Sequence, residues 1–414
     1  MTDAVRAAVA DAFRAEWGAL VATLIRVTGD WDLAEEAVQE AFALAMTSWP
    51  RDGIPDRPGA WLTTAARRRA IDRLRRDEVG AAKLREVAAM WDPPEPAASD
   101  ESGVTDDRLR LIFTCCHPAL ATEAQVALTL RTLAGLTTAE IARAFMVAEP
   151  TMTKRLVRAR QKIRHAAIPY RVPPAHLLPD RTPAVLAVLY LLFNEGYSAS
   201  AGAALVRRNL TDEAIRLARI LAALMPDEPE ALGLLALMLL HDARRAARVD
   251  DAGNLVILED QNRRLWDATA IAEGTALLDS ALRRARPGPY QTQAAIAACH
   301  AAAIHPGDTD WKQIAALYAH LVRLIPSPVV ELNRAVAVGM AEGPRAGLKL
   351  VEALIASGEL SGYHLLHAVR ADLLRRLGRD TDASIAYQQA LELASTEAER
   401  RYLHRRLAET SAIT

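Results

Sequence analysis

The chain has few cysteines, almost no net charge and no long apolar segment. Its three cysteines, Cys115, Cys116 and Cys299, are too few for a disulfide framework, so a reducing compartment, the cytoplasm, is predicted. The net charge of −1 excludes a general affinity for nucleic acid, and any basic surface must therefore be local. No apolar run is long enough to cross a bilayer, so no membrane contact is expected.

Aromatic residues are also scarce, at 5% of the chain, whereas alanine and leucine are abundant. This composition favours an all-α protein. A length of 414 residues predicts roughly two to four domains. Proline and charge patterns place the boundaries as follows: a helical domain at 1–90, an acidic Pro-rich linker at 91–107, a helix-turn-helix domain at 108–167, a Pro-rich hinge at 168–183 and a C-terminal helical array at 184–414.

The segment 135–164 is typical of a helix-turn-helix. A short helix from Thr138 is followed by a turn and a second helix, whose first turn suits Pro150 because proline lacks an N–H group. Helical spacing predicts that the second helix buries one stripe: Met152, Leu156, Ala159 and Ile163. The same helix carries six cations without an acid between them. The pattern predicts a helix that enters the major groove, and the alternative is a helical hairpin with a solvated basic face.

The segment 29–49 predicts a helix with an acidic face. On a helix, one side is apolar and the opposite side carries Asp32, Glu35, Glu36, Gln39 and Glu40. Such a face is commonly solvated. It also suits docking on a basic partner.

A second helix, predicted at 58–77, is rich in arginine. It carries Arg67, Arg68, Arg69, Arg73, Arg75 and Arg76 against one internal acid, Asp72. This charge predicts contacts with phosphates, and Trp61 is placed to stack on bases. The alternative is an exposed helix whose arginines pair with Asp77 and Glu78.

The C-terminal half shows weak internal repetition. Similar segments end at Ser395, Pro326 and Pro226, and the separations are near multiples of the 34-residue tetratricopeptide period. A degenerate helix-pair solenoid is predicted, with an irregular α-domain as the alternative. Within it, the residues Asn194, Glu195, Gly196 and Tyr197 form a signature that is either a turn between solenoid helices or a binding segment.

Motifs that would indicate an enzyme are missing. The chain has no nucleophile elbow, phosphate loop or dinucleotide fingerprint, so neither catalysis nor a cofactor is predicted. Cys115, Cys116 and His117 lack metal-ligand spacing, because adjacent side chains on a helix diverge. They are interpreted as core cysteines and a helix-end histidine, and no metal site is expected.

Together, these segments resemble a group IV (extracytoplasmic-function) sigma factor of bacterial RNA polymerase. DLAEEAVQEAF resembles sigma region 2.1–2.2, WLTTAARRRAIDRLRR resembles region 2.3–2.4, and LTTAEIARAFMVAEPTMTKRLVRARQKIR resembles region 4.2. The segments LYLLFNEGYSAS, ALGLLALMLLHDARRAAR, QAAIAACHA, DTDW and SPVVELNRAVAV resemble the subgroup with a tetratricopeptide-like C-terminal extension. The chain departs from the family at Met146, where glycine is usual, and at Arg68, where asparagine is usual.

The resemblance implies a partner for each segment. The acidic face would dock on the clamp of the largest subunit of core RNA polymerase, and the helix-turn-helix domain would meet the β flap. Trp61 and the arginines of 67–76 would engage the −10 element of promoter DNA. At the −35 element, Thr151, Thr153, Lys154 and Arg155 would face base edges, whereas Arg158, Arg160 and Lys162 would hold phosphates. The C-terminal domain would modulate these activities from within the chain.

Two other functions remain compatible with the sequence. One is a helix-turn-helix transcriptional regulator with a tetratricopeptide sensor domain, which binds DNA without joining polymerase. The other is a tetratricopeptide scaffold whose N-terminal half binds only protein. The segment 29–77 favours the sigma factor, because a plain regulator has no use for an acidic docking helix followed by an arginine-rich helix.

Overall fold

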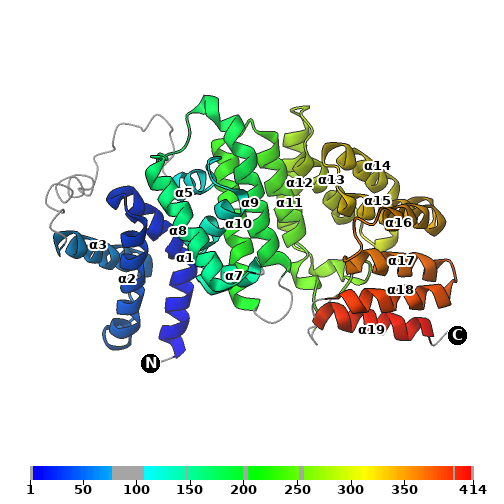
Figure 1. Ribbon diagram of the computed structural model, residues 1–414, viewed down its shortest axis with the longest axis horizontal. Helices are drawn as coiled ribbons and strands as arrows, with labels where there is room; N and C mark the ends of the chain where they lie inside the picture. The colour runs from blue at the N-terminus through cyan, green and yellow to red at the C-terminus, as the bar shows by residue number, and fades with distance from the viewer. Residues whose placement is uncertain are drawn as a thin grey trace. The chain divides into compact units, whose positions relative to one another are not determined.

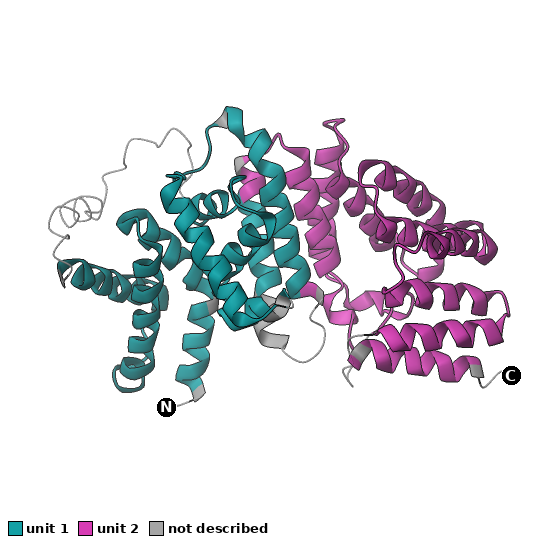
Figure 2. Ribbon diagram, viewed as in Figure 1, with its two compact units in different colours: residues 1–196, 209–220 teal, residues 197–208, 221–414 magenta. Residues whose placement is uncertain are grey.

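A computed structural model describes residues 3–76, 107–145, 147–198, 204–250, 256–394 and 397–411. Every regular element in these ranges is an α-helix or a short 3₁₀ helix, which confirms the all-α prediction (Figure 1). None of the helices within the described ranges is both long and apolar enough to cross a membrane. The chain divides into two compact units: unit 1 comprises residues 1–196 and 209–220, and unit 2 comprises residues 197–208 and 221–414 (Figure 2).

Unit 1 begins with three long helices. They are α1 (Asp3–Thr28), α2 (Trp31–Asp52) and α3 (Pro58–Arg76). Asp30 caps α2, because its carboxylate accepts hydrogen bonds from the N–H groups of Asp32 and Leu33 at 2.9 and 3.1 Å. The three helices pack on one another around buried side chains that include Trp17, Val38, Trp49 and Leu62.

Four helices follow and contain the helix-turn-helix. They are α5 (Asp107–Cys115), α6 (Thr122–Thr132), α7 (Thr138–Ala144) and α8 (Glu149–His165). Pro150 lies in the first turn of α8, as predicted. The predicted stripe is confirmed, since Met152, Leu156, Ala159 and Ile163 are all buried. Met146 lies outside the described residues.

Helix α1 packs closely against the α6–α7 connection. A Cβ atom on Gly18 would lie 2.6 Å from the carbonyl oxygen of Leu133, so only glycine allows this approach. Gly135 adopts a positive φ of 68°, and a Cβ there would lie 2.9 Å from the rings of Phe13 and Trp17. The three-helix bundle and the helix-turn-helix are therefore packed together within unit 1.

Only one of the two predicted joints lies within the described residues. The acidic linker 91–107 lies outside the described residues except for Asp107, which begins α5 and pairs with Arg26 at 3.0 Å. The predicted hinge 168–183 is packed rather than free at its start, where the Tyr170 hydroxyl donates to the carbonyl of Ala22 at 2.8 Å. Its last residues are helical, because α9 (Leu178–Ser198) begins before Pro183.

Unit 2 is built from successive helix pairs. After α10 (Ala204–Leu224), whose residues divide between the two units, come α11 (Pro229–Asp242), α12 (Ala268–Leu282), α13 (Pro289–Ala302), α14 (Trp311–Leu324), α15 (Pro328–Glu342), α16 (Pro344–Ser357), α17 (His364–Arg376), α18 (Asp380–Leu393) and α19 (Glu397–Ser411). Alternate helices α14, α16 and α18 begin at residues 311, 344 and 380, close to the 34-residue period. Helices α17, α18 and α19 lie side by side (Figure 1).

Candidate nucleic-acid interface

Helix α8 presents most of its cations to solvent. Thr151, Thr153, Lys154, Arg158 and Lys162 are exposed. Arg155 is half-buried, and its guanidinium lies 5.5 Å from the centre of the Phe145 ring. That contact holds Arg155 against the turn that precedes α8.

A hollow of about 390 Å³ lies between α8 and the start of α6. Lys154, Arg158 and Lys162 line one side, and Ala121 and Ala124 line the other. Ala121 provides no side-chain cap to α6, so the first N–H groups of that helix are not satisfied by a cap. A helix N-terminus beside three cations favours a phosphate group at this place.

The arginines of α3 are divided between free and paired positions. Arg68 and Arg75 are exposed, whereas Arg69 pairs with Glu40 at 3.5 Å and Arg73 pairs with Glu36 at 3.2 Å. Arg67 is half-buried, and the side chain of Arg76 lies outside the described part of the chain. Two of the α3 cations, Arg69 and Arg73, thus face the α2 acids.

Trp61 is held at the start of α3 rather than standing free. Its ring meets the ring of the buried Trp49 edge-on, with 5.6 Å between the ring centres. The contact ties the beginning of α3 to the end of α2.

The acidic face of α2 is exposed except at one residue. Asp32, Glu36 and Gln39 are exposed and Glu40 is half-exposed, but Glu35 is only 5% exposed. The prediction that Glu35 shares the open acidic face is wrong. Helix α2 is covered on two sides, so Glu35 falls on the side that meets α6 and α8.

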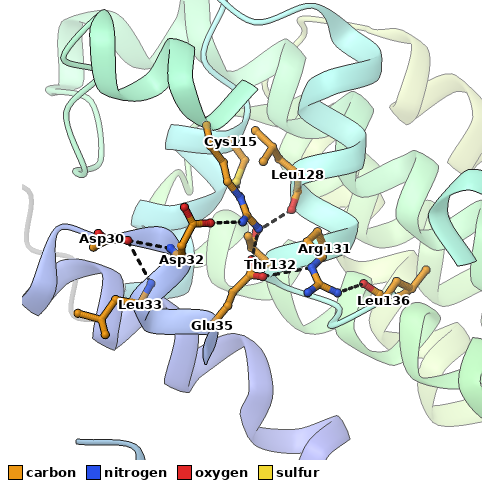
Figure 3. Close-up of polar contacts among 10 residues, drawn as sticks. Asp30, Asp32, Leu33, Glu35, Cys115, Leu128, Arg131, Thr132 and Leu136 are labelled. Atoms are coloured by element: carbon orange, nitrogen blue, oxygen red, sulfur yellow. Dashed lines mark hydrogen bonds and ion pairs between the residues drawn. The ribbon is translucent and has the colours of Figure 1, made fainter. Parts of the chain in front are cut away.

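Two arginines enclose Glu35, of which Arg131 is labelled in Figure 3. Arg131 of α6 donates from Nε to one carboxylate oxygen at 3.2 Å, and Arg160 of α8 donates to the other. Arg160 also bonds Asp32 at 2.6 Å, and Arg131 donates to the carbonyl of Leu136 at 3.0 Å. Burial raises the pKa of Glu35 above its usual value, although Arg160 and Arg131 act in the opposite direction.

Arg160 was expected to stand on the phosphate-facing side of α8, and that expectation is wrong for this arrangement. Its side chain is 14% exposed, and its Nε atom is buried without a hydrogen-bond partner among the described residues. Arg131 was missed by sequence reasoning, because a single arginine in an apolar helix carries no pattern that points to a distant carboxylate.

Cys115 and Cys116 lie in the interior of unit 1, as interpreted from the sequence. Cys115 contacts the hydroxyl of Thr132 at 3.6 Å (Figure 3), and burial raises its pKa to about 12. Burial also raises the pKa of Cys116. Both side chains are therefore neutral thiols that fill the core near α6.

The signature at 194–197 is not a turn. Asn194, Glu195, Gly196 and Tyr197 all lie in the last turns of α9. The Arg248 guanidinium stacks 3.6 Å from the centre of the Tyr197 ring and donates to the Tyr197 carbonyl at 2.6 Å. Arg244 donates to the Tyr197 hydroxyl at 3.1 Å. These bonds satisfy the end of the helix, which explains why a turn-like sequence stays helical.

Comparison with known families assigns both halves of unit 1. Residues 12–78 match the family described as Sigma-70 region 2, and residues 110–163 match Sigma-70, region 4. The ECF RNA polymerase sigma factor SigK of Mycobacterium bovis is 30% identical over 144 residues, 34% of this chain and 76% of the relative. The chain belongs to the ECF RNA polymerase sigma factors.

Other relatives are consistent with this membership. The probable ECF RNA polymerase sigma factor SigI of Mycobacterium tuberculosis is 29% identical over 40% of this chain and 58% of its own length. The uncharacterized protein R00370 of Rhizobium meliloti is 47% identical over 94% of this chain and 92% of its own length. Residues 181–282 match a family of unknown function, DUF6596. No solved structure matches the chain.

The structure assigns these sigma regions to helices. Region 2 comprises most of α1 together with α2 and α3, and region 4 comprises α5 to α8. An ECF sigma factor binds DNA in transcription initiation, and its sigma-70 domains imply RNA polymerase and promoter DNA as partners. The helices that carry the acidic and basic surfaces are those of the two sigma regions.

Proposed function

We propose that this sigma factor binds core RNA polymerase through α2, reads the −10 element with α3 and reads the −35 element with α8. The observation that carries the proposal is the order of surfaces within the two sigma regions. An exposed acidic helix and an arginine-rich helix fall in region 2, and an exposed cationic helix falls in region 4. The proposal places the protein in the cytoplasm, where its two partners are.

The polymerase contact is assigned to the accessible part of α2. Asp32, Glu36, Gln39 and Glu40 offer carboxylate and amide oxygens to a basic element of the largest-subunit clamp. Glu36 and Glu40 pair with half-exposed arginines of α3, and exposed ion pairs contribute about 0–1 kcal/mol, so their exchange for polymerase cations costs little. Asp32 is bonded by Arg160 of α8 and becomes available only when that contact opens. Glu35 can contact polymerase only after Arg131 and Arg160 release its carboxylate.

Promoter melting is assigned to α3. Extracting a base from the stack costs a few kcal/mol. Arg68 and Arg75 are exposed and can hold the phosphate backbone of the separated DNA strand. Arg67, Arg69 and Arg73 lie on the same helix. Trp61 fixes the start of α3 on Trp49, so that the arginines approach the DNA from a rigid base.

Reading of the −35 element is assigned to α8. Thr151, Thr153, Lys154 and Arg155 lie near its N-terminus, the end that reaches base edges in this motif. Arg158 and Lys162 lie one and two turns further and hold phosphates beside the start of α6. The opposite side of region 4 remains for the β flap.

The packed arrangement of unit 1 is a closed state of this machinery. Helices α3 and α8 both pair with α2, whose 22 residues span only about 33 Å. Elements centred near −10 and −35 are about 25 base pairs apart, roughly 85 Å of duplex. Regions 2 and 4 therefore have to separate before both elements are bound.

Run-off transcription with core polymerase tests the proposal. The full chain is expected to direct initiation at a promoter upstream of its own operon. The double variant Lys154→Ala with Arg158→Ala should lose initiation, whereas Arg164→Ala, a cation in the last turn of α8, should retain it. Absence of initiation from the operon and its neighbours contradicts the proposal.

The alternative, a regulator that does not join polymerase, predicts a different outcome in a simpler assay. A regulator does not travel with core polymerase during purification, whereas a sigma factor does. Charge reversal at the exposed Glu36, as Glu36→Lys, should reduce the recovery of core polymerase. Absence of core polymerase from the purified unaltered chain argues for the regulator, whereas equal recovery with Glu36→Lys and with the unaltered chain removes Glu36 from the proposed contact.

A further inference from the structure

Unit 2 holds two adjoining cavities that neither sigma region accounts for. Their volumes are about 430 and 510 Å³, within the usual range of roughly 300–1,000 Å³ for small-molecule sites. Val336 and Met340 of α15 and Tyr402 of α19 line both of them. The residues that line the smaller cavity indicate more clearly what kind of ligand it would bind.

The walls of the smaller cavity are mainly apolar. They come from α15, α17 and α19 and from the segment that precedes α12, and include Ile257, Val336, Met340, Leu365, Val369 and Leu403. The charged groups at its edge neutralise one another. Arg376 donates to both oxygens of Glu259 at 2.9 and 3.1 Å and to Asp372 at 2.7 Å. An anionic ligand thus finds no unpaired arginine among the described residues here, because Arg376 is already paired with two carboxylates.

One buried polar group at this cavity has no satisfied hydrogen bond. The side chain of Tyr387 is 1% exposed, and its hydroxyl proton has no acceptor among the described residues, because its neighbour Arg375 can only donate. The adjacent Arg375 donates to Asp372 at 2.7 Å, and its Nε is also without a partner. Because buried polar groups are nearly always satisfied, the hydroxyl indicates a missing partner in the cavity.

A second polar atom lines the same cavity. The Nε2 atom of His364 lies 3.6 Å from a carboxylate oxygen of Glu399, beyond hydrogen-bond distance, and has no other partner within the described ranges. Ligand sites typically combine apolar walls with a few such polar groups.

The segment that precedes α12 limits the size of ligand that the cavities can hold. Ile257 and Glu259 form part of the wall of both cavities. Their segment is fixed by the Glu259–Arg376 pair and by Arg263, which donates to the carbonyl of His300 at 2.6 Å at the end of α13. This fixed segment closes part of the wall, and the remaining volume of about 430 Å³ is within the range of small-molecule sites.

We propose that unit 2 binds an uncharged, mainly apolar small molecule with one hydrogen-bond acceptor. The apolar body fills the cavity of about 430 Å³, and the acceptor takes the proton of the Tyr387 hydroxyl. The proposal concerns unit 2 alone and does not depend on the assignment of polymerase or promoter contacts.

Nile red, an uncharged apolar dye with a carbonyl group, is a suitable probe. Titration of the full chain should give saturable fluorescence with one site per chain. The variant Ala368→Trp, which fills the cavity from α17, should abolish the saturable signal. Its control is Ala316→Trp, an exposed position on α14 that lines neither cavity, and it should bind normally.

The variant Tyr387→Phe keeps the ring and removes the hydroxyl, so the fold should persist. It should weaken Nile red binding roughly fivefold, the value of one ordinary hydrogen bond. Circular dichroism establishes that each variant is folded. Non-saturable fluorescence, or Ala368→Trp that binds as the unaltered chain does, overturns the proposal. Tighter binding of the anionic dye 8-anilinonaphthalene-1-sulfonate at this site overturns the assignment to an uncharged ligand.

Discussion

Arg160 of α8 and Glu35 of α2 form a buried ion pair across 125 residues of sequence. One belongs to the helix assigned to the −35 element and the other to the helix assigned to polymerase. While the pair persists, neither side chain reaches an external partner. Under the proposed function, this contact would have to open before either helix binds its partner.

Replacement of Arg160 should weaken unit 1. In Arg160→Ala, Glu35 stays buried with Arg131 as its one remaining cation, and we expect a loss of about 3 kcal/mol in unfolding free energy. Arg158→Ala removes an exposed cation from the same helix and should change it by less than about 0.5 kcal/mol. Urea unfolding followed by circular dichroism measures both values. Equal midpoints for the two variants would contradict the structural role of Arg160.

Weakening the contact between Arg131 of α6 and Glu35 should increase the affinity of the protein for core polymerase. Arg131→Gln removes a cation from Glu35 without altering any residue assigned to DNA or polymerase, and glutamine can still donate to Leu136. If opening costs less by about 1 kcal/mol, core polymerase binds roughly fivefold more tightly. Titration with fluorescently labelled core enzyme measures the affinity. Weaker binding would show that the closed state assists rather than opposes assembly.

The α8 cations should determine the salt dependence of DNA binding. Each phosphate contact contributes about 0.9 to the slope of log affinity against log salt concentration. Removal of Arg158 and Lys162, the two cations assigned to phosphates, should lower the slope of holoenzyme on promoter DNA by about 2, because both are exposed. Fluorescence anisotropy at several salt concentrations gives the slope. An unchanged slope would move the phosphate contacts to another surface.

Unit 2 should lose stability in mild acid. Desolvation, with nearby arginines, lowers the pKa of His241 to about 3 and of His300 to about 4, from an ordinary value of 6.5. The unfolded chain then binds more protons than the folded chain as pH falls from about 6.5 towards 4, so folding weakens in that window.

Each of these histidines should contribute about 2 kcal/mol of destabilisation between pH 7 and 5. His241→Gln retains an acceptor for Arg244 but does not titrate, and should reduce the pH dependence by that amount. Urea unfolding at both pH values tests this, and an identical pH dependence in the variant would exclude His241 as a source.

Helices α15 and α16 pack so closely at Gly347 that there is no room for an added methyl group. A Cβ on Gly347 would lie 2.6 Å from the carbonyl oxygen of Ala335 and 2.8 Å from the Cα of Gly339. Gly347→Ala should destabilise unit 2 by about 1–3 kcal/mol through overpacking. Gly362→Ala, which meets open space, is the matched control. Thermal unfolding should separate the two variants by several degrees.

Local patterns predicted much of the helix-turn-helix. The buried stripe of α8 follows from helical spacing, and the position of Pro150 follows from its missing N–H group. The opposite outcome at 194–197 shows the limit of such patterns. Asparagine and glycine favour a turn locally, but Arg244 and Arg248 hold Tyr197 in the helix from 47 and 51 residues away.

The surface of α2 shows the same limit. Helical periodicity gives only the angle of each residue around the helix axis. On that basis alone, Glu35 and Glu36 share the acidic face of α2. Periodicity cannot indicate that α6 and α8 cover part of that face. Glu35 is buried because Arg131 and Arg160 arrive from distant segments and compensate its charge.

The amino-acid sequence alone determined the all-α class, the two sigma regions and the cationic character of α3 and α8, since these depend on periodicity, charge and short motifs. Only the tertiary structure decided which charged groups are free. Pairing of Glu35 with Arg160 and the cavity around Tyr387 arise from contacts between residues remote in sequence, and local propensity carries no information on such contacts.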